Sequence, residues 1–168
     1  RSVLHYALED KKNLAAALIL LPLIKKPNKP NRKGVTPLMI AANKGMVSAM
    51  HALCEASHED VQTFDEQGHN ALHHAAIAGQ AESITYLVKQ GFDVDQSETL
   101  QKPGKADKCG HRTPLHLAAL RGHEEAVYRL LELKADPTKE DAQGNALCEY
   151  AVLGKNKEVM NLMRLLPY

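Results

Sequence analysis

Histidine and cysteine are the residues of this 168-residue chain whose side chains are best suited to bind a metal ion or to catalyse a reaction. The sequence holds nine histidines and three cysteines. Cys109 and His111 stand close together, but a structural zinc site needs four ligands and this pair supplies only two. The sequence therefore predicts no metal site and no bound cofactor.

Catalytic motifs give no stronger signal. The chain has no G-x-S-x-G nucleophile turn, no glycine-rich phosphate loop and no H-E-x-x-H pair. Carboxylates such as Glu124 and Glu125 stand where a helix would expose them to solvent, and charge at such positions usually serves solubility. We expect no catalytic residues, and hence no enzyme activity, within these 168 residues.

Composition places the chain among globular proteins, with 44% hydrophobic and 24% charged residues. The odd number of cysteines argues against a disulfide framework and predicts an intracellular location, in the cytoplasm or nucleus. The longest apolar run, Leu14 to Ile24, is interrupted by Pro22 and falls short of the roughly 20 residues of a membrane helix, so no membrane span is expected. Because the chain begins with Arg1 rather than Met, we expect it to be part of a larger protein.

An internal repeat must position any functional side chain. Thr36 to Ala42 (TPLMIAA) recurs as Asn70 to Ala76 (NALHHAA) and as Thr113 to Ala119 (TPLHLAA), and more loosely from Ser2 and from Asn145. The anchoring leucines lie at spacings of 34, 34, 43 and 32 residues: Leu4, Leu38, Leu72, Leu115 and Leu147. In the last four copies a glycine follows the leucine by seven residues, and apolar residues three and four apart then predict a second helix. Each unit is therefore a short helix, a glycine turn, a longer helix and a polar loop.

This unit resembles the ankyrin repeat, whose period is about 33 residues and whose signature is T-P-L-H-x-A. The resemblance implies one domain over residues 1–168, an all-α solenoid of stacked helix-turn-helix units with finger loops. Its five repeats are expected at residues 1–30, 31–64, 65–106, 107–139 and 140–168, with an inserted finger loop at 96–106. Arrays of this kind also occur in proteins that intracellular bacteria deliver into host cells, for which the location would be the host cytosol.

The resemblance also assigns structural roles to several polar residues. His73 and His116 hold the histidine position of the motif and His123 follows the turn glycine, so all three are expected to tie repeats together through hydrogen bonds. His74 replaces the usual leucine and needs a polar partner. Cys54 and Cys148 stand at apolar positions and are predicted to be small core residues. The apolar second helix of the first repeat, Leu14 to Leu21, predicts that upstream sequence covers it.

Charge is distributed unevenly along the chain. Residues 1–33 hold eight Lys and Arg against two Asp and Glu, whereas the remainder holds 13 against 18. Positions that the resemblance places on the concave and finger surface form the predicted partner-binding set: Arg32, Lys33, Lys44, His69, Ile77, Arg112, Leu120 and Arg121. Two interpretations of the lysines stay open, a basic rim that binds an acidic partner and a merely solvated edge.

The predicted function is that of a module that binds a protein or peptide. Nucleic acid is disfavoured, since stacking aromatics and an overall basic charge are both missing. Two alternatives remain. The repeats could be the substrate-targeting arm of an enzyme whose catalytic domain lies outside this chain, or a structural spacer that docks flanking regions of the same protein.

Overall fold

The computed structural model describes residues 2–57, 61–99, 110–154 and 157–164, with only the backbone for 162–164. Every regular element in these ranges is a helix, and none of the described residues forms a strand. The α-helices are α1 (Val3–Glu9), α2 (Leu14–Leu20), α3 (Pro37–Lys44), α4 (Val47–Ala56), α5 (Ala71–Ile77), α6 (Ala81–Lys89), α7 (Pro114–Leu120), α8 (Glu124–Glu132), α9 (Leu147–Leu153) and α10 (Lys157–Arg164). Two 3-10 turns, Lys11–Asn13 and Leu21–Leu23, flank α2.

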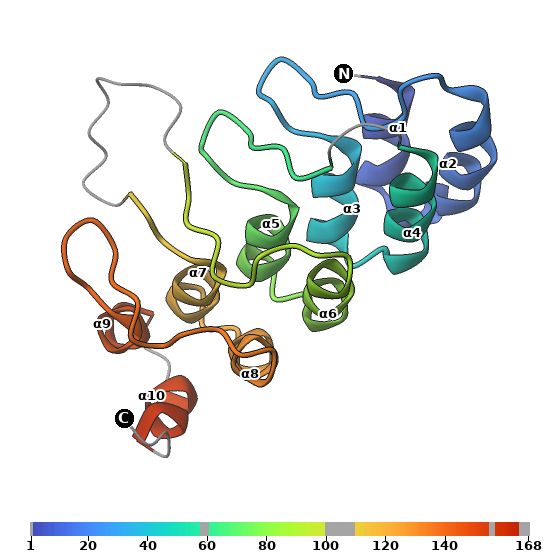
Figure 1. Ribbon diagram of the computed structural model, residues 1–168. Coiled ribbons are helices and arrows are strands. Elements are labelled where there is room, and N and C mark those ends of the chain that lie inside the picture. Colours follow the sequence, from blue (N-terminus) through green and yellow to red (C-terminus); the bar gives the residue numbers. More distant parts are fainter. Residues whose placement is uncertain (1, 58–60, 100–109, 155–156, 165–168) are drawn as a thin grey trace.

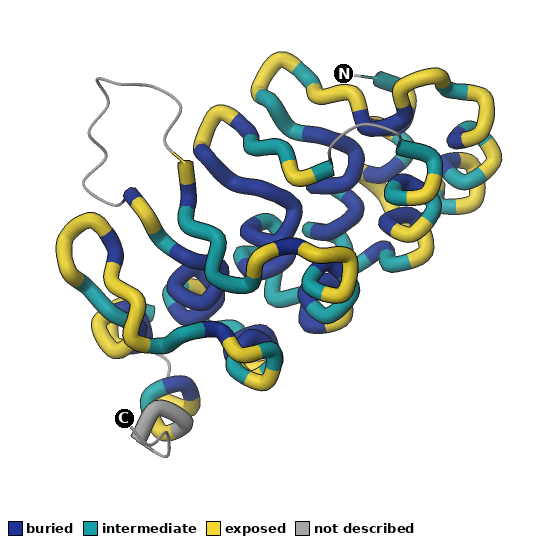
Figure 2. Tube along the Cα trace, in the orientation of Figure 1, coloured by how far each residue is buried: buried dark blue, intermediate teal, exposed yellow. Residues whose placement is uncertain are grey.

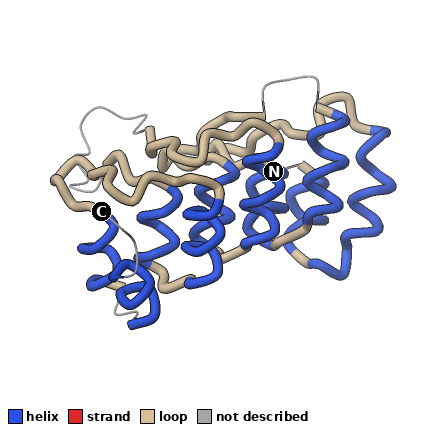
Figure 3. The backbone as a smooth tube through the Cα atoms, turned by 60° about the horizontal axis from the view of Figure 1, so that its bottom comes forward, coloured by secondary structure: helices blue, strands red, loops and turns tan. Residues whose placement is uncertain are grey.

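The helices form two layers. Helices α1, α3, α5, α7 and α9 pack one after another in the first layer, and α2, α4, α6, α8 and α10 do so in the second (Figure 1). Within each repeat, the helix of the first layer also packs against its successor in the second. The long loops between repeats gather along one edge of this array, and the short turns within repeats lie along the opposite edge (Figure 3). The fold is the predicted all-α solenoid of helix-turn-helix units.

The repeated motif explains where the first-layer helices begin. The Thr36 hydroxyl accepts a hydrogen bond from the amide of Met39 at 3.3 Å, and Asn70 Oδ1 accepts one from the amide of His73 at 3.1 Å. These bonds satisfy amides that have no partner within the first helical turn. Proline begins α3 and α7, at a position where its missing N–H costs nothing.

The turn glycines fit the prediction in three repeats and differ from it in the last. Gly45, Gly79 and Gly122 have φ between 71° and 73°, a left-handed conformation that favours glycine. Gly154 has φ −71°, which any residue adopts. A side chain at Gly154 would instead collide with the carbonyl oxygen of Ala119, so close packing against α7 requires the glycine there.

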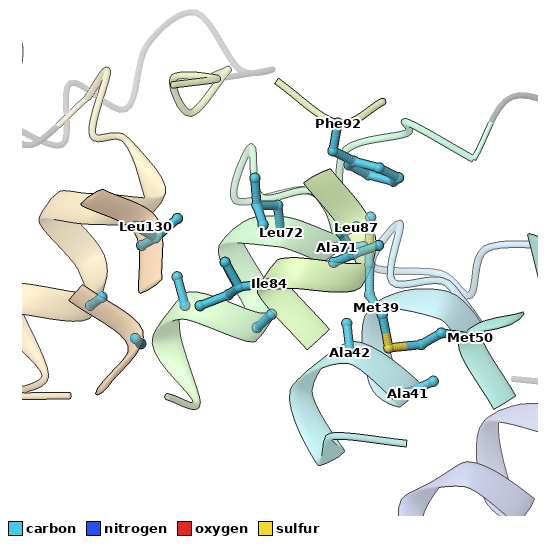
Figure 4. Close-up of a cluster of buried hydrophobic side chains, with 14 of the residues drawn as sticks. Met39, Ala41, Ala42, Met50, Ala71, Leu72, Ile84, Leu87, Phe92 and Leu130 are labelled. Atoms are coloured by element: carbon cyan, nitrogen blue, oxygen red, sulfur yellow. The ribbon is translucent and has the colours of Figure 1, made fainter. Parts of the chain in front are cut away.

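The core runs through the whole stack between the two layers. The four leucines that anchor the later repeats are at most 1% exposed, and so are the paired alanines of α3, α5 and α7. Figure 4 shows Ala71, Leu72 and Ile84 packed between neighbouring repeats. Small alanines bring the helices of the first layer close together, and α3, α5 and α7 are the most continuously buried part of the described chain (Figure 2).

The first repeat exposes part of its apolar surface. Ile19 and Leu23 are 70% and 77% exposed, and Val3 and Tyr6 are also largely exposed. The expectation that upstream sequence covers this surface stays a prediction. None of the described helices is both long enough and apolar enough to traverse a lipid bilayer.

Candidate functional site

A hollow of about 310 Å³ opens between the finger of repeat two and the first-layer helices α1, α3 and α5. Its lining is Glu9, Asn31, Lys33, Val35, Met39, Ile40, Asn43, Lys44 and His74. Its apolar lining residues are Val35 of the finger and Met39 and Ile40 of α3, and the others are two lysines, one glutamate, two asparagines and His74. Sequence analysis had selected Lys33 and Lys44 but missed Glu9, Asn43 and His74, since a repeat pattern does not show which side chains of neighbouring copies meet.

The other predicted contact residues lie at different depths. Arg32 and Arg121 are exposed. Ile77 and Leu120 are the last residues of α5 and α7 and are half-buried. None of these four residues lines the hollow. The two remaining members of the set, His69 and Arg112, face inward and bind another residue.

That residue is Glu98, whose side chain is 1% exposed. Arg112 donates to both of its carboxylate oxygens, from Nε at 2.8 Å and from Nη2 at 3.0 Å, and His69 Nε2 lies 2.6 Å from Oε1. Burial by itself raises the pKa of Glu98, but the hydrogen bonds from His69 and Arg112 outweigh it and leave the pKa below its ordinary value. Glu98 is thus held as a carboxylate.

The Glu98 cluster fixes the base of the predicted inserted finger. The amide of Glu98 donates to the carbonyl of Arg112 at 2.9 Å, which joins the two ends of the long connection. The amide of Thr99 donates to the carbonyl of Gly68 at 3.2 Å and so attaches this connection to the preceding finger. Of the predicted insertion at 96–106, residues 100–106 lie outside the described residues.

A carboxylate or amide side chain shapes each of three fingers. Oδ1 of Asn31, of Asp65 and of Asp141 accepts hydrogen bonds from the amides two and four residues further on, at 2.8–3.1 Å. The second oxygen of each aspartate binds a side chain of the following helix. Asp65 Oδ2 lies 2.9 Å from His74 Nε2, and Asp141 Oδ2 accepts from the Tyr150 hydroxyl at 2.6 Å.

These bonds lower the pKa of both aspartates. Burial opposes ionisation at each, but the hydrogen bonds from His74 and from the amides of His69 and Gln67 leave the pKa of Asp65 below its usual value. At Asp141 the Tyr150 and Asn145 bonds likewise outweigh burial, and the pKa falls to about 2. The expected polar partner of His74 is therefore Asp65.

Of the three histidines predicted to tie repeats together, His116 and His123 make long-range hydrogen bonds and His73 does not. His116 Nε2 lies 2.9 Å from the carbonyl oxygen of Lys139, and His123 Nε2 lies 3.0 Å from that of Ile77. His73 Nδ1 accepts from the amide of Asn70, but its Nε2 is buried near the backbone of Arg112 without a hydrogen bond of good geometry. Burial, together with the neighbouring His69, lowers the pKa of His73 to about 4.

The cysteine predictions have different outcomes. Cys54 is half-buried and packs against the core, as expected. Cys148 is exposed, so its assignment to the core was wrong; its thiol donates to Glu149 at 2.8 Å. Cys148 is exposed because the fifth repeat has one residue fewer between its finger and its leucine. A shift of one residue turns a helix by about 100° and so points the side chain in a different direction.

Of the predicted Cys109–His111 pair, His111 is exposed with φ 67°, while Cys109 lies outside the described residues.

The stacked helix pairs and their shared finger geometry define a helical-repeat solenoid. A family model described as "Ankyrin repeats (3 copies)" matches residues 4–98 and 98–165. The chain belongs to the ankyrin-repeat family.

Curated relatives are similar over most of this chain. "Ankyrin repeat domain-containing protein SOWAHD" of Homo sapiens is 33% identical over 67% of the chain and 35% of its own length. "Putative palmitoyltransferase ZDHHC13" of Danio rerio is 29% identical over 80% of the chain and 19% of its own length. "L-asparaginase" of Dirofilaria immitis is 28% identical over 75% of the chain and 25% of its own length. The chain thus spans about a fifth to a third of these relatives.

Proposed function

We propose that this chain binds an acidic protein or peptide through the surface formed by its fingers and first-layer helices. Ankyrin repeats are generally protein–protein interaction modules and are typically not catalytic. The observation that carries the proposal is the hollow, which is lined by Lys33 and Lys44 together with the apolar Val35, Met39 and Ile40. The two lysines would attract an acidic partner and fix its orientation, while the apolar residues would accept an apolar side chain.

The contacts are proposed at three depths. Lys33 and Lys44 bind the partner directly in the hollow, and Arg32, Ile77, Leu120 and Arg121 extend the surface. His69 and Arg112 act through Glu98, by holding two fingers at a fixed spacing. Because these bonds exist before a partner arrives, the fingers lose little conformational entropy on binding.

Charge reversal tests the surface. The test variant carries Lys33→Glu and Lys44→Glu. The control variant carries Lys89→Glu and Lys157→Glu, which change the net charge by the same amount at exposed positions of the second layer. Lys44 and Lys89 both end their helices, so the effects on those helices are matched. Proteins captured from cell lysate by the immobilised chain are identified by mass spectrometry, and circular dichroism verifies folding.

We expect a partner that the original chain and the control capture and that the Lys33/Lys44 variant loses. This partner should also dissociate more readily as the salt concentration rises. Equal capture by both variants would place binding elsewhere and contradict the proposal.

Two other functions have support of their own. Relatives named as a palmitoyltransferase and an L-asparaginase extend far beyond the matched region, which supports a substrate-targeting arm for an enzyme encoded outside this chain. The exposed Ile19 and Leu23 support an intramolecular docking spacer.

Free thiols at Cys54 and Cys148 support an intracellular location.

A further inference from the structure

Three potential metal ligands meet where the finger of the third repeat, hereafter the third finger (residues 65–70), joins α5. Asp65, His69 and His74 each offer one ligand atom, and these atoms all lie within 4.8 Å of one another. Asp65 and His69 are buried, whereas the His74 side chain is 18% exposed and lines the hollow. The cluster is therefore preformed and remains within reach of an ion from solvent.

The hydrogen bonds of His69 leave one ring nitrogen without a partner. Its Nε2 is held by Glu98 at 2.6 Å, and Glu98 is in turn held by Arg112. Its Nδ1 is buried without a hydrogen bond, on a side chain that is only 9% exposed. Metal-binding histidines characteristically hold a carboxylate or carbonyl with one nitrogen and the metal with the other. A bound cation would satisfy the buried nitrogen, which is otherwise unfavourable.

The other repeats show that the finger does not require these histidines. The position of His69, just before the helix cap, is occupied in repeats two, four and five by Val35, Arg112 and Asn145. The position of His74, in the following helix, is occupied there by Ile40, Leu117 and Tyr150. Tyr150 binds the finger aspartate as His74 does, but a phenol is a poor zinc ligand. Among the described fingers, only the third combines the carboxylate with two imidazoles.

We propose that Asp65, His69 and His74 form a binding site for a divalent transition-metal ion such as Zn²⁺, with water as the fourth ligand. Two imidazoles and one carboxylate suit Zn²⁺, whereas Mg²⁺ and Ca²⁺ prefer oxygen ligands alone. The hydrogen bond between His74 and Asp65 would be exchanged for bonds of about 2.0–2.2 Å to the ion.

Two variants remove ligands with little disturbance of the fold. Asp65→Asn keeps the finger, because Asn31 makes the same two backbone contacts in the preceding repeat. His74→Leu installs the residue that Leu117 supplies at this position in repeat four. His51→Ala is the control, since His51 is an exposed imidazole that pairs with Glu55 on α4, away from the cluster.

Zn²⁺ binding is measured by isothermal titration of the 168-residue chain, together with the visible absorption spectrum of the Co²⁺-loaded chain and the thermal unfolding midpoint. We expect one Zn²⁺ per chain and a higher unfolding midpoint with the ion, because it binds only the folded state. Both ligand variants should bind at least about tenfold more weakly and lose the Co²⁺ spectrum, while His51→Ala keeps both.

Two results would overturn the proposal. Zn²⁺ bound with unchanged affinity by Asp65→Asn and His74→Leu, with both shown by circular dichroism to be folded, would place the ion elsewhere. A failure of the original chain to bind Zn²⁺ in excess would leave the three residues as a hydrogen-bonded cluster only. Neither result bears on the proposed protein partner, because Lys33 and Lys44 are unchanged.

Discussion

His116 joins α7 to the connection that follows α8, and this link makes stability depend on pH. His116 Nδ1 accepts from the amide of Thr113 at 3.1 Å, and Nε2 lies 2.9 Å from the carbonyl oxygen of Lys139. The first bond needs an unprotonated nitrogen, so the ring serves both contacts only in its neutral form. Burial lowers the pKa of His116 below 6.5, ahead of smaller opposing effects from Lys139 and Asp141.

We therefore expect His116→Met, which copies Met39 of the second repeat, to destabilise the domain most at neutral pH. The loss of two hydrogen bonds should lower the free energy of unfolding by about 1–3 kcal/mol at pH 7. Below pH 6.5 the unfolded chain protonates His116 while the folded chain resists, so the original protein loses stability that the variant does not. Urea unfolding at pH 7 and pH 5 measures both, and a difference that grows toward pH 5 would contradict this account.

Residue types alone could not reveal what His69 and Arg112 contact. The repeat pattern placed them at the finger surface, and the structure turns both toward Glu98. Glu98 lies within the predicted insertion at 96–106, where no repeated motif indicates which way its side chain points. Likewise, Asp65 and His74 belong to one predicted repeat, but only the geometry of the finger brings them within 2.9 Å. Regular motif positions are easier to predict: the ring of His116 accepts from the amide of Thr113, and both residues lie within one copy of the motif.

At the scale of elements, the fingers depend on close backbone contacts between neighbours. Gly68 has φ 80°, and a side chain there would collide with the backbone of Thr99 at the base of the next finger. Gly91 follows α6 with φ 89°, and a side chain there would meet nothing within 4 Å. The two glycines share a backbone conformation and differ only in their surroundings.

Alanine substitution at these two sites separates conformation from contact. Gly91→Ala should lower the free energy of unfolding by about 1–2 kcal/mol, the usual effect of a left-handed alanine. Gly68→Ala should cost about 1–3 kcal/mol more, because the finger must move away from Thr99. Chemical unfolding of both variants measures the difference, and equal losses would show that the fingers do not depend on this contact.

The fifth repeat shows the limit of predicting elements from spacing. The final interval of 32 residues was evident in the sequence, and a helix was correctly expected after it. Spacing did not reveal the change of register in this repeat. The finger aspartate, Asp141, makes the same backbone contacts as Asp65. Helix α9 nevertheless begins at Leu147 itself, whereas α3, α5 and α7 begin one residue before their leucine. This change of register exposes Cys148 and brings Tyr150 to Asp141.

At the scale of the whole molecule, the array is one-dimensional, because the principal helix contacts are within a repeat or between adjacent repeats. The middle repeats are covered on both sides, whereas the first exposes Ile19 and Leu23. The general architecture could be predicted because one unit cannot bury its apolar face alone and must stack. Such an array need not unfold all at once, and the two ends should open more readily than the centre.

Two matched core deletions test this gradient. Leu72 in α5 and Leu147 in α9 are both 0% exposed and both anchor the repeat motif, and replacing either with alanine should remove about 2–5 kcal/mol of packing energy. Leu147→Ala should accelerate amide hydrogen exchange in α9 and α10 while α3 and α5 stay protected. Leu72→Ala should accelerate exchange on both sides of its repeat and lower the unfolding midpoint of the domain. Amide hydrogen exchange measured by mass spectrometry distinguishes local opening at the ends from unfolding of the whole array. If Leu147→Ala accelerates exchange equally in all repeats, the array unfolds as a single cooperative unit.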